Sequence, residues 1–223
     1  MGSSRLPGKT MMDLAGKPLI DHVIERCIST VAIDDVVVVT TNLKEDNVLE
    51  THIRKKYSIH TYRGDPLDVR SRFEAVAKEY GFEVIVRVTA DDPFKDPNHI
   101  QEAIQALNSD EVDYFNNFEI PIYPIGLDIE SFKAEALFQN IATDNSEKSK
   151  EHVTYGIRHS PHFLRQHKSG EPEFTKVRLT IDTPEDFSFC SKLLEVNPEM
   201  GHSSYDWAAT REALLSLQKT QQV

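Results

Sequence analysis

Two kinds of hydrophobic pattern alternate along the chain. Residues 36–41 and 82–89 are nearly continuous apolar, largely β-branched runs, which is typical of strands covered on both faces. Between such runs, apolar positions recur every three or four residues, as at Leu19, Val23 and Cys27, and this spacing predicts amphipathic helices. The expected strands are residues 36–41, 59–62, 82–89, 112–116, 126–132 and 174–181, and the expected helices are residues 18–28, 45–57, 65–80, 184–196 and 205–218, with a further one that begins at residue 97.

The alternation of these elements, with short connections between them, predicts the fold class. It favours a three-layer α/β/α sandwich around a mixed, mostly parallel sheet. A length of 223 residues fits one large domain, so we expect residues 1–223 to form a single unit. Residues 117–172 are less regular and include Pro121, Pro124 and a polar run at 143–151. We expect this segment to form either a lobe over the functional site or an arm at a dimer contact.

Composition and charge exclude several classes of function. The formal net charge of −11 argues against a general nucleic-acid surface, which needs a basic stripe, although a local basic pocket is still compatible with it. No apolar run approaches the ~18 residues that a membrane span needs, and no signal-peptide pattern opens the chain. Cys27 and Cys190 are too few for a disulfide framework and lack metal-ligand spacing. We therefore expect a cytoplasmic protein without membrane or nucleic-acid partners.

Residues 2–9, with the sequence GSSRLPGK, have the chemistry of a phosphate cradle. Small side chains leave backbone N–H groups accessible to an anion, and Arg5 and Lys9 add positive charge. The segment nearly matches a P-loop, but five residues separate Gly2 from Gly8 where a P-loop has four, and Pro7 lacks an amide donor. We therefore favour a triphosphate cradle of another kind.

Two carboxylates follow expected strands and are candidate metal ligands. Asp91 comes just after residues 82–89, and Asp182 directly follows residues 174–181. Ligands of open α/β sheets lie beyond the carboxyl ends of the strands, and Mg²⁺ is usually held by one or two carboxylates together with phosphate oxygens. The alternative is that each aspartate caps a helix. Beside a phosphate cradle we favour the metal site, and we expect Asp186, one turn into its helix, to be structural.

Five motifs in this order resemble those of sugar-activating cytidylyltransferases. The resemblance is strongest to the spore-coat polysaccharide group and extends to the 3-deoxy-manno-octulosonate and acylneuraminate cytidylyltransferases. It covers essentially the whole chain. The motifs are GSSRLPGK with GKPLI at 2–9 and 16–20, RGDPLDV at 63–69, IVRVTAD at 85–91, EHVT at 151–154 and DTPED at 182–186.

The resemblance implies a fold, a reaction and partners. The implied fold is that of the nucleotide-diphospho-sugar transferases, which are often dimeric. The implied reaction is Mg²⁺-dependent transfer of CMP from CTP to a sugar, often an acidic one, with release of pyrophosphate, for the synthesis of cell-surface polysaccharide or glycans. The implied partners are therefore CTP, a sugar acceptor and a second copy of the chain.

The resemblance also implies roles for individual residues. His152 has an alternative reading as a helix-surface histidine, and this alternative stays open. The implied roles are nucleotide binding for Gly2, Ser3, Ser4, Arg5, Lys9, Arg63 and Arg72, metal binding for Asp91 and Asp182, catalysis for Arg5, Lys9, Asp91 and Asp182, and acceptor binding for Asp128, Glu130 and His152.

One departure from the family pattern bears on activity. Relatives have an apolar strand ahead of the glycine-serine motif, whereas Met1 already lies inside that motif. The strand would be central in the sheet, so we expect its neighbours to have unpaired edges. Two alternatives stay open: the true start lies upstream of this Met, or the chain is a shortened form, active or inactive.

Two other functions stay open at this point. A catalytically impaired nucleotide-binding homologue is compatible with the missing strand. A glycosyltransferase of similar fold is the second, although such enzymes commonly carry an Asp-x-Asp metal motif, and here Asp91 and Asp92 are adjacent.

Overall fold

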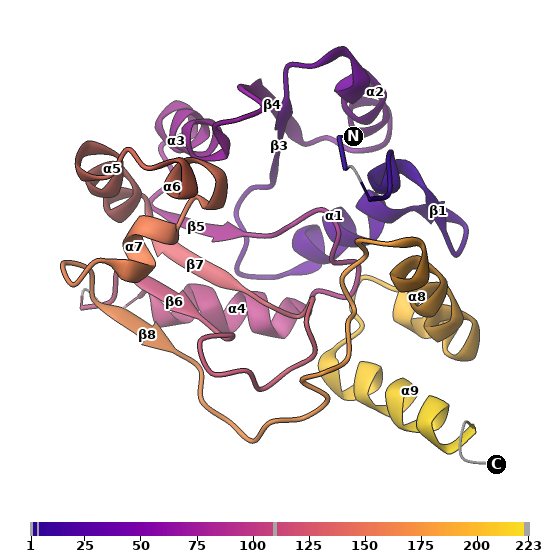
Figure 1. Cartoon of the computed structure of the whole chain (residues 1–223). Helices are drawn as coiled ribbons and strands as arrows, with labels where there is room; N and C mark the ends of the chain where they lie inside the picture. The colour runs from indigo at the N-terminus through magenta and orange to yellow at the C-terminus, as the bar shows by residue number, and fades with distance from the viewer. Residues whose placement is uncertain (1, 4, 109–110, 221–223) are drawn as a thin grey trace.

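The computed structural model describes residues 2–3, 5–108 and 111–220 (Figure 1). The strands are β1 (Asp13–Leu14), β2 (Lys17–Pro18), β3 (Val37–Thr41), β4 (His60–Gly64), β5 (Val84–Arg87), β6 (Tyr114–Asn116), β7 (Glu130–Lys133) and β8 (Arg165–His167). The α-helices are α1 (Leu19–Ser29), α2 (Asn47–Lys56), α3 (Val69–Tyr80), α4 (Pro97–Ala106), α5 (Ala134–Thr143), α6 (Glu147–His152), α7 (Tyr155–His159), α8 (Pro184–Val196) and α9 (Trp207–Thr220), and short 3₁₀ helices cover Lys9–Met11, Lys44–Asp46 and Pro198–Gly201. In this part of the chain, no helix combines the length and the apolar character needed to cross a membrane.

The largest sheet has the strand order β5-β7-β6-β8. Strand β7 runs antiparallel to both β5 and β6, and β8 runs parallel to β6. A second, parallel pair joins β3 to β4, and β1 and β2 form a small hairpin. Residues 130–133 and 165–167, from the less regular segment, thus supply two strands of the largest sheet.

Helices cover both faces of the largest sheet, because successive side chains of a strand point to opposite faces. Tyr114 of β6 packs with Leu137 of α5 and Ile157 of α7 in one buried cluster. The next residue, Phe115, packs with Ile100 of α4 in another. The three-layer α/β/α class with a mixed sheet is therefore confirmed.

Several expected boundaries are correct, and one helix start is wrong. Helix α8 begins at Pro184, and Asp96 caps α4 with its side chain. Helix α3, however, begins at Val69, because the side chain of Asp68 accepts the hydrogen bond from the Ser71 amide. Asp65, the first residue of the expected helix at 65–80, instead accepts a hydrogen bond from the Leu67 amide in the preceding turn.

The expected strand at 174–181 is also wrong. Phe174 has φ of 55°, which interrupts an extended backbone, and only an isolated bridge joins Arg178 to Ile125. The expected strand at 126–132 shortens to β7 for a related reason. Gly126 has φ of 107°, and a Cβ there would lie 2.6 Å from the Thr180 amide nitrogen, so this position favours glycine.

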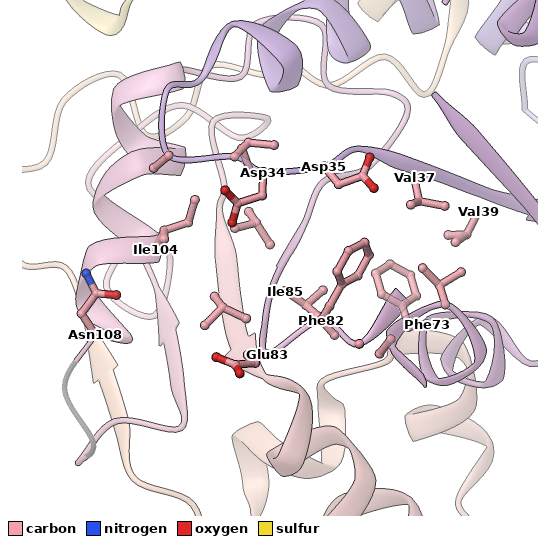
Figure 2. Close-up of a pocket in the computed structure, with 17 residues that line it drawn as sticks. Asp34, Asp35, Val37, Val39, Phe73, Phe82, Glu83, Ile85, Ile104 and Asn108 are labelled. Atoms are coloured by element: carbon pink, nitrogen blue, oxygen red, sulfur yellow. The ribbon is translucent and has the colours of Figure 1, made fainter. Parts of the chain in front are cut away.

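The β3–β4 pair does not join the four-stranded sheet β5-β7-β6-β8. Among the strands described, β3 pairs only with β4 and β5 only with β7, so each keeps an unpaired edge, as the sequence analysis predicts. A cavity of about 470 Å³ lies between these edges (Figure 2). As a result, Val37, Val38 and Val39 are half-buried, although their pattern predicts a strand covered on both faces.

The buried side chain of Arg26 ties α1 to two distant segments. Its guanidinium donates to the carbonyl oxygens of Lys95 at 2.9 Å, Met200 at 2.7 Å and Tyr205 at 2.6 Å. Burial, only partly offset by the charge of Asp96, lowers the pKa of Arg26 to about 10, so the group stays protonated at neutral pH. These contacts hold the C-terminal region against the helical layer.

Candidate functional site

The N-terminal segment folds back on itself at Gly8. Gly8 has φ of 73°, a conformation that favours glycine. The Lys9 amide donates to the Leu6 carbonyl at 3.2 Å, and the Met11 amide donates to the Gly8 carbonyl at 2.9 Å. The Leu6 amide also donates to the hydroxyl of Ser3 at 3.3 Å. This compact turn presents Lys9 to the rest of the molecule; Ser4 lies outside the described residues.

Lys9 brings together the two carboxylates proposed as metal ligands. Its Nζ donates to Asp91 Oδ2 at 2.8 Å, to Asp182 Oδ1 at 3.0 Å and to the Ile181 carbonyl at 2.7 Å. Desolvation lowers the pKa of Lys9, but the hydrogen bonds and charges of the two aspartates together outweigh it, so the pKa is raised. The side chain of Lys9 is therefore a fixed ammonium ion, 12% exposed.

The carboxylate of Asp182 forms ion pairs with three cationic side chains. Besides Lys9, Arg5 approaches its Oδ1 at 3.0 Å and Arg178 approaches its Oδ2 at 3.1 Å. Burial raises the pKa of this carboxyl, but the three cations outweigh it and the net shift is downward. Asp182 is thus held as a carboxylate.

Neither Asp91 nor Asp182 caps a helix among the described residues. The alternative interpretation of both residues as helix caps is therefore wrong. Thr183 is the N-cap of α8, and Asp186 completes a capping box with it. Asp186 also accepts from the Asp182 amide at 3.0 Å, so its expected structural role is confirmed. The Ile181 amide donates to the Asp91 carbonyl at 2.9 Å, which joins the two carboxylate-bearing loops.

A polar cavity of about 460 Å³ lies beside the cluster. Asp92, which lines this cavity, directly follows Asp91 of the cluster. The cavity contains all three residues proposed for acceptor binding, Asp128, Glu130 and His152. The other lining residues are Arg87, Thr89, Asp92, Lys95, Phe118, Thr154, Tyr155, Arg158 and His159.

Glu130 lines this cavity, and both of its carboxylate oxygens accept hydrogen bonds. Its Oε1 accepts from Arg87 at 2.7 Å, and its Oε2 accepts from the hydroxyls of Tyr114 and Thr154, each at 2.8 Å. A buried carboxylate with this many hydrogen-bond partners orients its neighbours. Glu130 therefore fixes Arg87 and Thr154 where they face the cavity.

Asp128 and Lys95 form the opposite wall. The Lys95 side chain is almost fully buried, pairs with Asp92 at 2.8 Å and donates to the backbone carbonyl of Asp128. Burial raises the pKa of the Asp128 carboxyl. Lys95 and Arg87 thus each have a carboxylate partner within the cavity wall.

Arg158 is a residue of this cavity that the sequence analysis does not single out. Its guanidinium carbon lies 4.9 Å from the ring centroid of Phe118. Its Nε is buried without a hydrogen-bond partner, and no carboxylate of the described residues forms an ion pair with it. It comes four residues after Thr154 on the short helix α7, a spacing that places the two residues on one face.

The backbone beside His152 is unusual. Val153, fully buried between α6 and α7, has φ of 47° and ψ of −61°, which is a sparsely populated conformation for a β-branched residue. This turn separates His152 and Thr154, and both line the cavity. Strain of this kind persists only where the surrounding packing holds it.

Arg63 and Arg72, proposed for nucleotide binding, have structural contacts. Arg63 donates to the carbonyls of Thr41 at 2.8 Å and Leu43 at 2.6 Å and forms an ion pair with Glu50 at 2.8 Å, so it holds the loop after β3. Arg72 is buried beside Gly64, and burial lowers its pKa. A nucleotide role for either residue stays a prediction.

Comparison with known sequences gives one family. The profile of the family described as "Cytidylyltransferase" matches residues 1–215. The spore coat polysaccharide biosynthesis protein SpsF of Bacillus subtilis (strain 168) is 31% identical over 208 residues, which cover 87% of this chain and 83% of that protein.

Comparison with solved structures shows the fold. A cytidylyltransferase from Leptospira borgpetersenii superposes with a TM-score of 0.89 at 24% identity, covering 100% of this chain and 92% of that one. A CMP:2-keto-3-deoxy-manno-octonic acid synthetase complexed with CTP superposes with a TM-score of 0.63 at 18% identity, covering 87% and 94%. Both similarities extend over the sheet and its covering helices.

Proposed function

The chain belongs to the cytidylyltransferase family, and we propose that it transfers CMP from CTP to an acidic sugar, with release of pyrophosphate, for the synthesis of a surface polysaccharide. One observation carries the proposal. The cluster of Lys9, Asp91 and Asp182 adjoins a polar cavity of about 460 Å³, a volume within the range of small-ligand sites. The proposed triphosphate cradle would thus lie beside space for the proposed acceptor.

The reaction asks for positioning and charge neutralisation rather than a covalent intermediate. A hydroxyl oxygen of the sugar forms a bond to the α-phosphorus and loses its proton to solvent, while the bond from that phosphorus to the bridging oxygen breaks and the oxygen leaves with the pyrophosphate. Negative charge then develops on the departing pyrophosphate. Arg5 and Lys9 supply positive charge for this group, and preorganised charges of this kind account for much of the catalysis in many enzymes.

The residues of the cluster also fit a divalent cation. The carboxylates of Asp91 and Asp182 converge on one point, since both lie within 3.0 Å of the same Lys9 nitrogen. Two carboxylates plus phosphate oxygens suit Mg²⁺, which tolerates few protein ligands. When bound, this ion supplies electrostatic stabilisation of the phosphate oxygens. We propose that Asp91 and Asp182 hold it together with the nucleotide.

An acidic acceptor is supported by the charges of the cavity. Lys95 and Arg87 are paired with Asp92 and Glu130, whereas the guanidinium of Arg158 has a buried, unpartnered Nε. A guanidinium recognises a carboxylate with two parallel hydrogen bonds. We propose that Arg158 binds the carboxylate of the sugar.

The proposed function is tested by pyrophosphate release from CTP and Mg²⁺ in the presence of a panel of acidic and neutral sugars. Release with CTP and an acidic sugar, but not with CTP alone, is the expected result. Thermal-shift measurements with CTP, UTP, ATP and GTP, each with and without Mg²⁺, accompany the assay, because a ligand that binds the folded state raises its stability. Stabilisation by Mg²⁺-CTP without turnover of any sugar would instead indicate a nucleotide-binding homologue.

Replacing Arg158 with glutamine is expected to raise KM for the acidic sugar by about 10- to 100-fold with little change in kcat, because a charged hydrogen bond contributes about 1.5–3 kcal/mol. The Arg158→Lys variant keeps the charge but loses the planar guanidinium. Its KM is expected to lie between those of the unmodified chain and the Arg158→Gln variant. Steady-state kinetics measure both. Arg54→Gln, on the exposed face of α2, is the matched control. If Arg158→Gln raised KM equally for the same sugar with its carboxylate converted to an amide, recognition of the carboxylate by Arg158 would be contradicted.

A further inference from the structure

We infer that Arg178 is a positioning residue for Asp182. Together with Asp186, it fixes the plane of the Asp182 carboxylate so that Oδ1 stays turned toward Lys9 and Asp91. The inference deepens the proposed function and rests on it, because this orientation matters when the two carboxylates hold a dication against a triphosphate. Arg178 lies outside the residues that the sequence analysis places in the site.

Arg178, Asp182 and Asp186 form a closed ring of three polar contacts. Nη2 of Arg178 donates to Asp182 Oδ2 at 3.1 Å, and Nε of Arg178 donates to Asp186 Oδ1 at 3.3 Å. The ring closes through the Asp182 amide, which donates to Asp186 Oδ2 at 3.0 Å. Arg178 thus holds the carboxylate of Asp182, while Asp186 holds both Arg178 and the Asp182 backbone.

The two carboxylate oxygens of Asp182 have different partners. Oδ1 lies 3.0 Å from both Lys9 and Arg5, whereas Oδ2 is bound by Arg178. The torsion that turns an aspartate carboxylate about its Cβ–Cγ bond has broad minima, so the contacts of the two oxygens fix its plane. With Oδ2 held by Arg178, Oδ1 is the oxygen that Asp182 presents to the cluster.

Arg178 is the cation of this group that the proposed reaction leaves in place. Arg5 and Lys9 are proposed to contact the triphosphate, so its binding would draw both away from Asp182 Oδ1. Arg178 pairs with the other oxygen and is anchored by a second carboxylate, that of Asp186. It would therefore keep the Asp182 carboxylate turned after the other two cations have moved, as orienting partners of metal ligands do.

The backbone that carries Arg178 is itself held on both sides. The Ile125 amide donates to the Val177 carbonyl at 3.0 Å, and the Leu179 amide donates to the Ile125 carbonyl at 2.7 Å. Asp186 is likewise fixed, because it belongs to the capping box of α8. Side chains on such a supported frame position a functional group more precisely than side chains on a free loop.

Asp91 lacks an orienting partner of this kind. Its Oδ2 accepts from Lys9 at 2.8 Å, and the described residues supply no other ion pair or hydrogen bond to its carboxylate. Of the two carboxylates, only Asp182 is therefore held from outside the cluster, so the orientation of the pair depends on Arg178.

The first test is the crystal structure of the Arg178→Gln variant without ligands, compared with that of the unmodified chain. The Asp182 carboxylate is expected to rotate by at least about 30°, because Oδ2 loses its partner and the torsion is soft. Arg211→Gln is the matched control, since Arg211 has the same exposed fraction of 42% and one ion pair, with Glu173. An unrotated carboxylate in Arg178→Gln would overturn the inference.

The second test is the Mg²⁺ dependence of pyrophosphate release, at saturating CTP and with the acidic sugar that supports turnover. In Arg178→Gln, the half-maximal Mg²⁺ concentration is expected to rise about tenfold, as on loss of an orienting partner. At saturating Mg²⁺, kcat is expected to stay within about twofold. Arg178→Lys keeps the charge but not the fork that bridges two carboxylates, so its half-maximal concentration is expected to be intermediate. An unchanged Mg²⁺ dependence, or a loss of kcat that persists at saturating Mg²⁺, would overturn the inference.

A double-mutant cycle with Asp186→Asn tests the ring. Asparagine keeps an acceptor for the Asp182 amide but loses the ion pair with Arg178. If Asp186 acts through Arg178, the double variant raises the half-maximal Mg²⁺ concentration no more than Arg178→Gln alone, whereas multiplied effects would overturn the inference. If the unmodified chain releases no pyrophosphate with any sugar, the proposed function fails, and the two crystal structures still decide whether Arg178 holds Asp182.

Discussion

Replacing Asp91 or Asp182 with asparagine is expected to lower the rate of pyrophosphate release at least about a hundredfold. Each carboxylate lies within 3.0 Å of the Lys9 ammonium, and each is proposed to hold Mg²⁺ against the triphosphate. Loss of one preorganised electrostatic group typically costs a factor of about 10²–10³ in turnover. Asparagine keeps the size and most hydrogen bonds of the side chain, so the loss reports on charge.

The kinetic measurement needs a check on folding, since Asp182 also pairs with Arg5 and Arg178. Melting temperatures of both variants give that check. Glu79→Gln, an exposed position on α3, removes one negative charge away from the cluster and is expected to retain full activity. Full activity of both aspartate variants would refute the assignment of these carboxylates.

The second large effect concerns stability and is independent of the reaction. Arg26→Met is expected to lower the free energy of unfolding by about 3–5 kcal/mol, because three buried carbonyl oxygens lose their hydrogen-bond donor. The methionine fills a similar volume, but the carbonyls of Lys95, Met200 and Tyr205 lose their donor, and each buried unsatisfied group costs about 1–3 kcal/mol.

Urea denaturation, with the free energy extrapolated to water, measures this change. The control is Arg54→Met on α2, where an exposed pair with Glu50 contributes less than about 0.5 kcal/mol. A loss below about 1 kcal/mol for Arg26→Met would mean that water or a rearranged C-terminal region satisfies the three carbonyls.

The elements that follow from local chemistry are predictable from the sequence. Helix α8 begins at Pro184 because proline suits the first turn and Thr183 with Asp186 forms a capping box. Helix α4 begins after Asp96 for a similar reason.

The features that depend on distant contacts are not predictable in this way. Residues 174–181 have the apolar composition of a strand, yet their backbone is bent by the positive φ of Phe174 and by close contact with Gly126. The sequence indicates that Asp91 and Asp182 converge, but not that Lys9 lies between them. Arg158 is distinguished by a buried Nε that has no hydrogen-bond partner among the described residues, and only the folded cavity reveals this.

The position of Lys9 has a consequence for how the site selects its ligands. Its ammonium occupies the point on which both carboxylates converge, so the side chains neutralise one another. A dication alone would have to expel this cation from a half-buried position, and a polyphosphate alone would meet two carboxylates. If the proposed Mg²⁺ and triphosphate bound together, the carboxylates would hold the dication and Lys9 would contact the triphosphate. The proposed site would therefore bind either ligand weakly when it is alone and both more strongly when they are together.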